Sequence, residues 1–305
     1  MIEQVKANAE FVNEKSGHGE CYVNLLPSYA SSAQLSGAAG DTTTTYEDYV
    51  KFYFDNLAGL LGYVSYDHYP FTASESVRTN HLYDLAMMAS YCKANDVELR
   101  AFVQAYHYQK TGENVDQSLT TKAQLSWQIY SALAFGAKEI SYYGYYALYD
   151  WKTSTKTTAY EWAKDINNDI ASFGNAFMAY DWQGVMFYDK GETSAQMQAV
   201  KNGNADTAVT ASSNMVKSAI VSSDEVSFVS TTDTILGVFA TEAGDDAYLV
   251  ANYDLTSSST VTLTFANATS AIVYVNGAQT TVALENGVLT LNLGAGEGAF
   301  VVAQN

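Results

Sequence analysis

The chain has 305 residues, of which 48% are hydrophobic and 16% are charged, so it can bury a sizeable core and is not expected to be disordered. Asp and Glu outnumber Lys and Arg by 33 to 15, and the formal net charge of −18 would repel phosphate backbones and anionic lipids. We therefore expect no nucleic-acid partner, and no membrane span either, because no apolar run reaches about 20 residues.

Residues 1–180 alternate strand-like runs with amphipathic segments. The first of these, 1–15, has the character of a polar helix and not of a signal peptide. Strands are predicted where β-branched and aromatic residues cluster, over 21–30, 62–71, 98–106 and 138–146. Helices are predicted where apolar residues recur at helical spacing, over 46–62, 74–96, 120–137 and 158–177. Such alternation is typical of parallel βαβ units.

Residues 181–305 follow a different pattern. Apart from one helix near 192–201 and a Ser/Thr/Asn-rich loop over 202–223, short β runs alternate with turn residues. This pattern predicts an antiparallel β-sandwich that packs on the last helix through Phe173, Phe177 and Trp182. The predicted strands are 234–241, 246–254, 259–266, 271–277, 288–293 and 298–303.

The chain has two cysteines, Cys21 and Cys92. Two such residues do not make a disulfide framework, and both stand in apolar surroundings of the sequence. We expect buried free thiols and not a pair.

Four blocks of the first half carry a family resemblance. YVNLLPSYA, YVSYDHYPF, FVQAYHY and WQIYSALAFGAKEISYYGYY together resemble the fifth to eighth strands of clan A (β/α)8-barrel glycoside hydrolases, closest to the β-galactosidase-like group. The resemblance implies an α/β domain over 1–180, the C-terminal half of a TIM barrel, followed by a β-sandwich domain with its linker over 181–305. It also implies a carbohydrate substrate.

The same resemblance implies that something is missing. Such enzymes carry the general acid/base Glu at the end of the fourth strand, whereas Glu3, Glu10 and Glu14 lie on the first predicted helix and are expected to be solvated. The chain is therefore expected to be incomplete. Its expected protein partner is the missing N-terminal half-barrel or a second copy of itself, because half a barrel leaves two strand edges exposed.

Barrel active sites lie at the C-terminal ends of the strands. Asp67 is the one carboxylate at the predicted ends, and it is either a catalytic or sugar-binding group or a structural acceptor. Gln104 stands where the family places its nucleophile, and an amide cannot serve as one. It either binds a sugar hydroxyl or is a satisfied core amide.

Aromatic residues surround these positions. Tyr offers an apolar face and a polar tip, which suit the C–H faces and hydroxyls of a sugar, although about half of the tyrosines must fill the core. The expected substrate-binding residues are Asn24, Tyr66, His68, Tyr69, Gln104, Tyr106, His107, Tyr143, Tyr145 and Trp151.

Other chemistries find little support in the sequence. His68 and His107 lack a third ligand at recognisable spacing, so no metal is expected. Dinucleotide and phosphate-loop motifs and a GxSxG elbow are absent from the sequence, so no cofactor and no serine triad are expected. Three hypotheses remain: a glycosidase that is active once completed, a catalytically inactive carbohydrate-binding protein, and a surface structural or adhesion protein.

Overall fold

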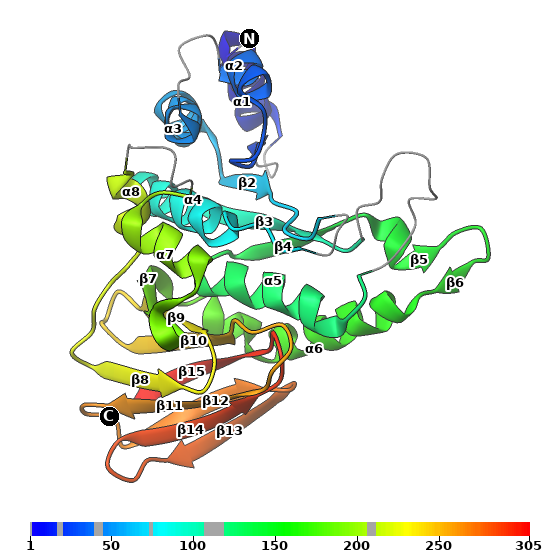
Figure 1. Cartoon of the computed structure of the whole chain (residues 1–305). Coiled ribbons are helices and arrows are strands. Elements are labelled where there is room, and N and C mark those ends of the chain that lie inside the picture. Colours follow the sequence, from blue (N-terminus) through cyan, green and yellow to red (C-terminus); the bar gives the residue numbers. More distant parts are fainter. Residues whose placement is uncertain (1, 17–20, 40–44, 73–75, 107–118, 206–211) are drawn as a thin grey trace.

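The computed structural model describes residues 2–16, 21–39, 45–72, 76–106, 119–205 and 212–305. Figure 1 shows the N-terminal helices at one end of the molecule, followed in space by a small parallel sheet, a layer of longer helices and the antiparallel sheets of the second half. Among the described helices, none combines the length and the hydropathy that a membrane crossing requires.

The α-helices of the described residues are α1 (Ile2–Lys15), α2 (Ser32–Ala39), α3 (Tyr46–Leu57), α4 (His81–Asn95), α5 (Lys122–Ala134), α6 (Thr158–Phe177), α7 (Ala195–Asn202) and α8 (Asn214–Lys217). The strands are β1 (Tyr22–Leu25), β2 (Tyr63–Asp67), β3 (Glu98–Gln104), β4 (Glu139–Tyr143), β5 (Tyr149–Asp150), β6 (Thr155–Lys156), β7 (Asp181–Tyr188), β8 (Val226–Ser230), β9 (Thr234–Ala240), β10 (Asp246–Asn252), β11 (Ser259–Phe265), β12 (Ser270–Val275), β13 (Ala278–Ala283), β14 (Val288–Leu293) and β15 (Gly298–Gln304).

The four strands predicted in the first half form one parallel sheet in the order β1-β2-β3-β4. Each predicted run overshoots its strand, because the residues after the strand enter loops at the sheet's carboxyl edge. Side chains alternate across β2: Val64 and Tyr66 belong to the main core, whereas Ser65 and Asp67 belong to the opposite face.

Helix boundaries follow local capping chemistry. Thr45 and Asp48 form a capping box at the start of α3, and Thr121 and Gln124 form another at the start of α5. Thr157 caps α6 by accepting from the backbone N–H of Tyr160. These caps explain why α3, α5 and α6 begin close to their predicted positions. The prediction for 74–96 is wrong at its start, since α4 begins only at His81.

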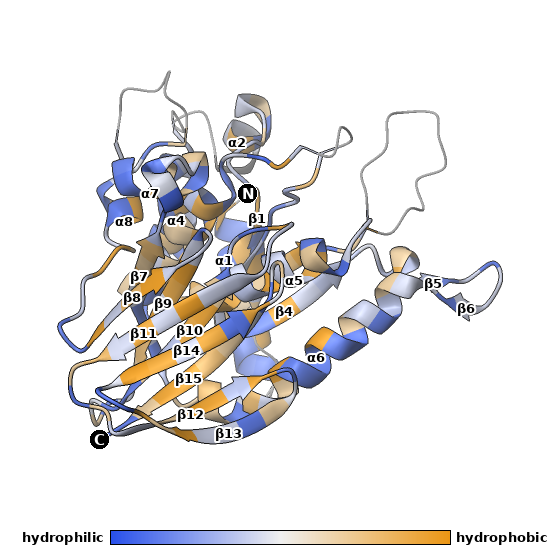
Figure 2. Ribbon diagram, turned by 60° about the horizontal axis from the view of Figure 1, so that its bottom comes forward, coloured by the Kyte–Doolittle hydropathy of each residue, from blue (hydrophilic) through white to orange (hydrophobic). Residues whose placement is uncertain are grey.

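The second half is antiparallel. Six strands pair in the order β13-β12-β15-β10-β9-β7 and three in the order β14-β11-β8. Hydrophobic and hydrophilic residues alternate along many of these strands (Figure 2). The α/β-then-antiparallel class is confirmed. Sequence patterns miss three strands of this half: β7, β8 and β13. β7 has a bulge between Trp182 and Gly184, and the residues of β13 are nearly all exposed and show no apolar alternation.

Aromatic rings join the two halves. The ring centroids of Phe173 and Phe177 on α6 each lie 5.5 Å from that of Phe300 on β15. The expected contact of Trp182 is corrected, because its Nε1 donates to the carbonyl of Ala134, at the end of α5, over 3.0 Å. The contact between α6 and the antiparallel sheets is therefore made by phenylalanines. Trp182 on β7 instead connects the six-stranded sheet to α5.

Helix α5 is buried on nearly every side: its buried residues run from Gln124 to Ala134 without a gap. Two glycines of the six-stranded sheet let strands approach it closely. A Cβ on Gly237 would lie 2.4 Å from the carbonyl oxygen of Ala134, and one on Gly298 would lie 2.4 Å from the ring of Tyr130. The helix therefore serves the parallel sheet and the antiparallel sheet as a shared layer.

Both cysteines are free. Cys92 on α4 is buried as expected, and burial raises the pKa of its thiol. Cys21 is only partly buried, and its thiol donates to the carbonyl of Ala9.

Candidate functional site

The carboxyl end of β2 carries an accessible carboxylate. Asn24 on β1 donates from Nδ2 to Oδ1 of Asp67 over 2.8 Å, and Ser65 donates from Oγ to Oδ1 of Asn24 over 2.7 Å. Asn24 is exposed and Asp67 is half-buried. This chain of polar groups crosses two neighbouring strands and orients the carboxylate at the rim of the sheet.

Tyr69 continues the site from Asp67. Burial raises the pKa of the Tyr69 hydroxyl, and the charge of Asp67 and a hydrogen bond to that carboxylate raise it further, so the phenol stays protonated. Its ring stacks on Tyr143 of β4 with centroids 4.8 Å apart. Tyr106 completes a three-ring cluster, 6.2 Å from Tyr69 and 5.7 Å from Tyr143.

Gly144 holds this cluster in shape. Its φ of +86° favours glycine, and a Cβ there would lie 2.7 Å from Cδ1 of Tyr106. The turn that follows presents Tyr145, which is 66% exposed, and beneath it Tyr146, whose ring lies 5.8 Å from Tyr106. Tyr143 itself is 44% exposed. The rim thus offers aromatic faces beside a carboxylate.

Trp151 lies on the β5–β6 hairpin and is 63% exposed. Asp150 stabilises the turn, because its Oδ1 accepts from the backbone N–H groups of Lys152 and Thr153. This hairpin projects away from the parallel sheet in Figures 1 and 2. The hairpin that carries Trp151 therefore lies away from the carboxyl edge of the sheet, where Trp151 was expected to bind a saccharide beside the tyrosines.

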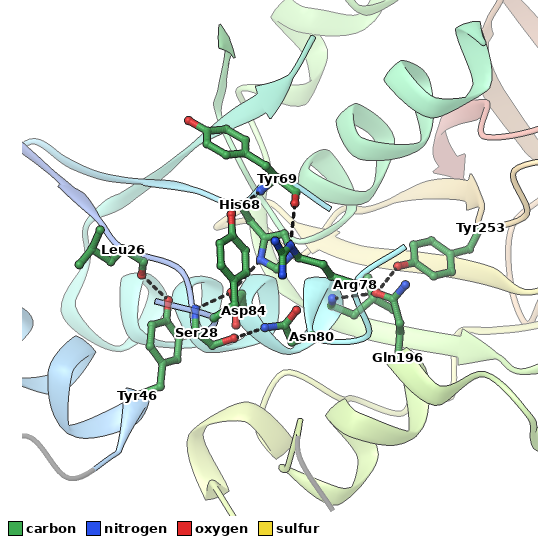
Figure 3. A network of polar contacts seen from close by, with 12 residues as sticks. Leu26, Ser28, Tyr46, His68, Tyr69, Arg78, Asn80, Asp84, Gln196 and Tyr253 are labelled. Carbon is green, nitrogen blue, oxygen red and sulfur yellow. Dashed lines mark hydrogen bonds and ion pairs between the residues drawn. The ribbon is translucent and has the colours of Figure 1, made fainter. Parts of the chain in front are cut away.

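A buried polar network lies behind the rim (Figure 3). Nδ1 of His68 lies 2.7 Å from Oδ2 of Asp84, and the same oxygen accepts from the backbone N–H of Ser28 over 3.0 Å. The side chains of His68 and Asp84 are 1% and 0% exposed. The network joins the loops after β1 and β2 to helix α4, and so fixes the backbone on which Asp67 stands.

Two further contacts hold the loop after β2. The backbone N–H of Tyr69 donates to the hydroxyl of Tyr29 over 3.0 Å, and burial raises the pKa of Tyr29 to about 12. Arg78 donates from Nε to the carbonyl of Tyr69 over 3.2 Å, and its guanidinium lies 3.9 Å over the ring of Tyr29. The rim is therefore supported by side chains from three segments.

His81 stands in the same buried region. The ring of His81 stacks on that of Trp127, with centroids 4.7 Å apart. The ring of His68 lies edge-on to it, with centroids 5.0 Å apart. Burial lowers the pKa of His81 well below its ordinary value, and the neighbouring His68 lowers it further. The ring is accordingly neutral at ordinary pH.

The structure corrects three expected surface residues. Gln104 is fully buried, and its amide bonds both ways to the backbone of Phe71, with 3.0 Å in each direction. Tyr66 faces the helices because it alternates with Asp67, and His68 lies in the buried network. None of the three presents its side chain to solvent at the rim, and Tyr106, which was expected there too, is buried at 6% exposure. His107 lies outside the described residues.

The rim therefore brings together Asn24, Asp67, Tyr69 and Tyr143, with Tyr106 beneath and Tyr145 alongside. Sequence reasoning did not identify Asp84. An acidic residue in the otherwise apolar run HLYDLAMM was the signal that could have found it, because a carboxylate there must be buried with a partner.

The described residues contain no group of three His, Cys, Asp or Glu side chains that could hold a metal ion. Two pockets lie elsewhere. One of about 450 Å³ lies at one end of the antiparallel sheets beside Glu225 and Asp246, and one of about 290 Å³ lies between α5, α6 and the turn at Asn276. We place more weight on the rim, because Tyr143 is 44% exposed there. The aromatic residues that line the two pockets are buried: Tyr130, Tyr180, Tyr248 and Phe265.

No family model and no curated protein matches the sequence. Among solved structures, similarity extends to a glycoside hydrolase family 30 subfamily 8 xylanase from Clostridium acetobutylicum, with TM-score 0.40 and 11% identity over 100% of this chain and 61% of the xylanase. A 4-O-α-L-rhamnosyl-β-D-glucuronidase from Fusarium oxysporum aligns with TM-score 0.38 and 11% identity over 86% of this chain and 57% of that protein. The chain thus spans 57% and 61% of the lengths of these two proteins. At such TM-scores the likenesses establish neither a detailed fold nor a function.

Proposed function

We propose that the chain is a saccharide-binding protein of the glycoside hydrolase type, and that it binds one sugar unit at the rim formed by β1, β2 and β4. The observation that carries the proposal is the pairing of an oriented carboxylate, Asp67, with the exposed stacked ring of Tyr143. A sugar needs both groups, because it presents C–H faces to aromatic rings and hydroxyls to polar acceptors.

The polar groups of the rim fit this ligand. Oδ1 of Asp67 is held by Asn24, which leaves the remaining acceptor capacity of the carboxylate for sugar hydroxyls. The half-buried Tyr69 hydroxyl stays protonated and donates to the same carboxylate, so its oxygen remains as an acceptor for a sugar hydroxyl. Such pre-oriented groups lower the ordering cost of binding.

Binding is favoured over cleavage for the isolated chain. Hydrolysis of a glycosidic bond ordinarily uses two carboxyl groups on opposite sides of the bond. Of the residues that end the four described parallel strands, only Asp67 carries a carboxylate. The amide of Gln104, which ends β3, is hydrogen-bonded to the backbone of Phe71. We propose in addition that this sheet is one half of an eight-stranded barrel, so that turnover requires the other half.

The test is calorimetric titration of the full chain with a panel of neutral oligosaccharides, with the wild type compared with Asp67→Ala and Tyr143→Ala. Loss of a hydroxyl partner costs about 0.5–1.5 kcal/mol, and more when the acceptor is charged, so Asp67→Ala should weaken binding several-fold or more. Thermal melting of each variant checks that it remains folded.

Val229→Ala is the matched control for Tyr143→Ala, since Val229 is 58% exposed on β8, far along the chain from the rim. It should leave affinity unchanged. Absence of affinity for every saccharide in the panel, or equal affinity in wild type and folded Asp67→Ala, contradicts the proposed function and leaves Asp67 with a structural role.

A further inference from the structure

Among the residues that the structure describes, the parallel sheet has one covered face and one open face. Helices α4 and α5 contact β3 on one side. The opposite side carries a stack of three side chains, Tyr22, Tyr63 and Arg100. The ring centroids of Tyr22 and Tyr63 lie 4.8 Å apart, and the guanidinium carbon of Arg100 lies 3.3 Å from the ring centroid of Tyr63. Parallel sheets are ordinarily covered on both faces, so this arrangement calls for an occupant.

The two edges of the sheet are also unpaired among the described strands. β1 and β4 each have one strand neighbour, and they run in the same direction. Exposed aromatic residues lie next to both edges. Tyr22 on β1 is 50% exposed. Tyr143, the last residue of β4, and Tyr145 in the turn that follows are 44% and 66% exposed. An unpaired edge with apolar residues beside it favours strand addition.

We infer that a second copy of this chain occupies the open face and closes an eight-stranded parallel barrel. In a twofold dimer, β4 of each copy lies beside β1 of the other, and all eight strands keep one direction. Four strands per copy supply the eight that a packed-core barrel uses. Both open edges and both open faces are then covered at once by one symmetric contact, as closed oligomers require.

Charge sets a condition on this dimer. Each chain carries −18, so association is opposed by repulsion that salt screens. On the open face, Arg100 pairs with Glu139 over 3.1 Å and with Glu98 over 3.6 Å, so this cluster adds one net negative charge per copy to that repulsion. The dimer should therefore strengthen as ionic strength rises, which is the opposite of an association driven by opposite charges.

The copy would also complete the site, and this part of the inference rests on the proposed function. The carboxyl ends of all eight strands would share one mouth, so a second Asp67 would stand across from the first. One saccharide would then bind per two chains, because both copies contribute to a single mouth.

The test measures mass by analytical ultracentrifugation of the full chain over a concentration series at low and high salt. We expect twice the chain mass of 33.1 kDa, with more dimer at high salt. Tyr22→Lys should shift the chain to monomer, because an edge lysine blocks strand pairing. Val229→Lys, which alters a comparably exposed residue on β8, should not. Amide exchange should slow in β1 and β4 as the dimer forms.

A mass that stays at 33.1 kDa under all conditions overturns the inference, and so does a dimer whose β1 and β4 amides exchange as fast as in the monomer. The proposed function is judged separately by titration. A monomer that binds one saccharide per chain contradicts the proposed dimer and supports the proposed function. A dimer that pairs through β1 and β4 but has no affinity for saccharides supports the dimer and contradicts the function.

Discussion

The antiparallel sheets and the parallel sheet bury polar groups in different ways. In the antiparallel region, the hydroxyl of Ser230 lies 2.7 Å from those of both Thr234 and Ser259, and Nδ2 of Asn252 donates to two carbonyls. Behind the parallel sheet, Nε2 of His68, both ring nitrogens of His81 and Oδ1 of Asp84 have no hydrogen-bond partner among the described residues.

This difference indicates where each region derives its stability. Satisfied hydroxyl pairs and apolar contacts stabilise the antiparallel sheets at any pH near neutrality. The helix-side core of the parallel sheet holds titratable groups in a buried setting, which costs stability and ties it to pH. Buried polar groups without hydrogen-bond partners are typical of functional sites. The rim lies directly in front of the buried His68, His81 and Asp84.

The largest expected effect removes apolar packing from the antiparallel side. Phe300 is fully buried and contacts Phe173 and Phe177, so Phe300→Ala should lower the free energy of unfolding by about 3–5 kcal/mol. Urea unfolding at mildly acidic and mildly alkaline pH should give the same loss, because no titratable group is removed. If the loss of unfolding free energy caused by Phe300→Ala depended strongly on pH, the antiparallel sheets would not differ from the parallel sheet in the pH dependence of their stability.

A smaller effect is expected at two glycines that share a left-handed backbone. Ala in this conformation costs roughly 1–2 kcal/mol, so Gly144→Ala and Gly191→Ala should both lower the melting temperature. Only Gly144→Ala places a Cβ against Tyr106, whereas Gly191 has no neighbouring atom within 4 Å. Gly144→Ala should therefore destabilise more and weaken saccharide binding. Equal effects of the two substitutions on binding would show that Tyr106 does not shape the rim.

The smallest effect concerns pH. Because the folded-state pKa of His81 is depressed, the unfolded chain binds more protons below the ordinary histidine pKa. The contribution of His81 is thus fully present above about pH 6.5 and is lost as the pH falls, at no more than about 1.4 kcal/mol per pH unit. His81→Phe should flatten this part of the profile of unfolding free energy against pH. An unchanged slope would mean that another group carries it.

The order of the elements followed from the sequence, because hydrophobic period and turn residues are local signals. The strand over 288–293 has its predicted bounds, and so does the helix over 158–177. β13 was missed because an exposed edge strand needs no apolar alternation. At the site, the position of Asp67 at the end of a predicted strand placed it at the rim. The same argument could not show that the Gln104 side chain bonds to the backbone of Phe71, since that contact depends on the path of a loop.

The position of α5 bears on how this chain could be recombined with others. Trp127 donates from Nε1 to the carbonyl of Tyr253, and Gly237 and Gly298 of the antiparallel sheet leave room for the helix on the same side. A sandwich transplanted from another protein would arrive without these matching glycines and would collide with the helix, while a parallel sheet moved alone would expose it. A recombination point near residue 180, where the sequence pattern changes from alternating helices and strands to short β runs, would separate α5 from its contacting glycines. Chimaeric proteins joined there would therefore be insoluble unless α5 and the two glycines came from the same parent.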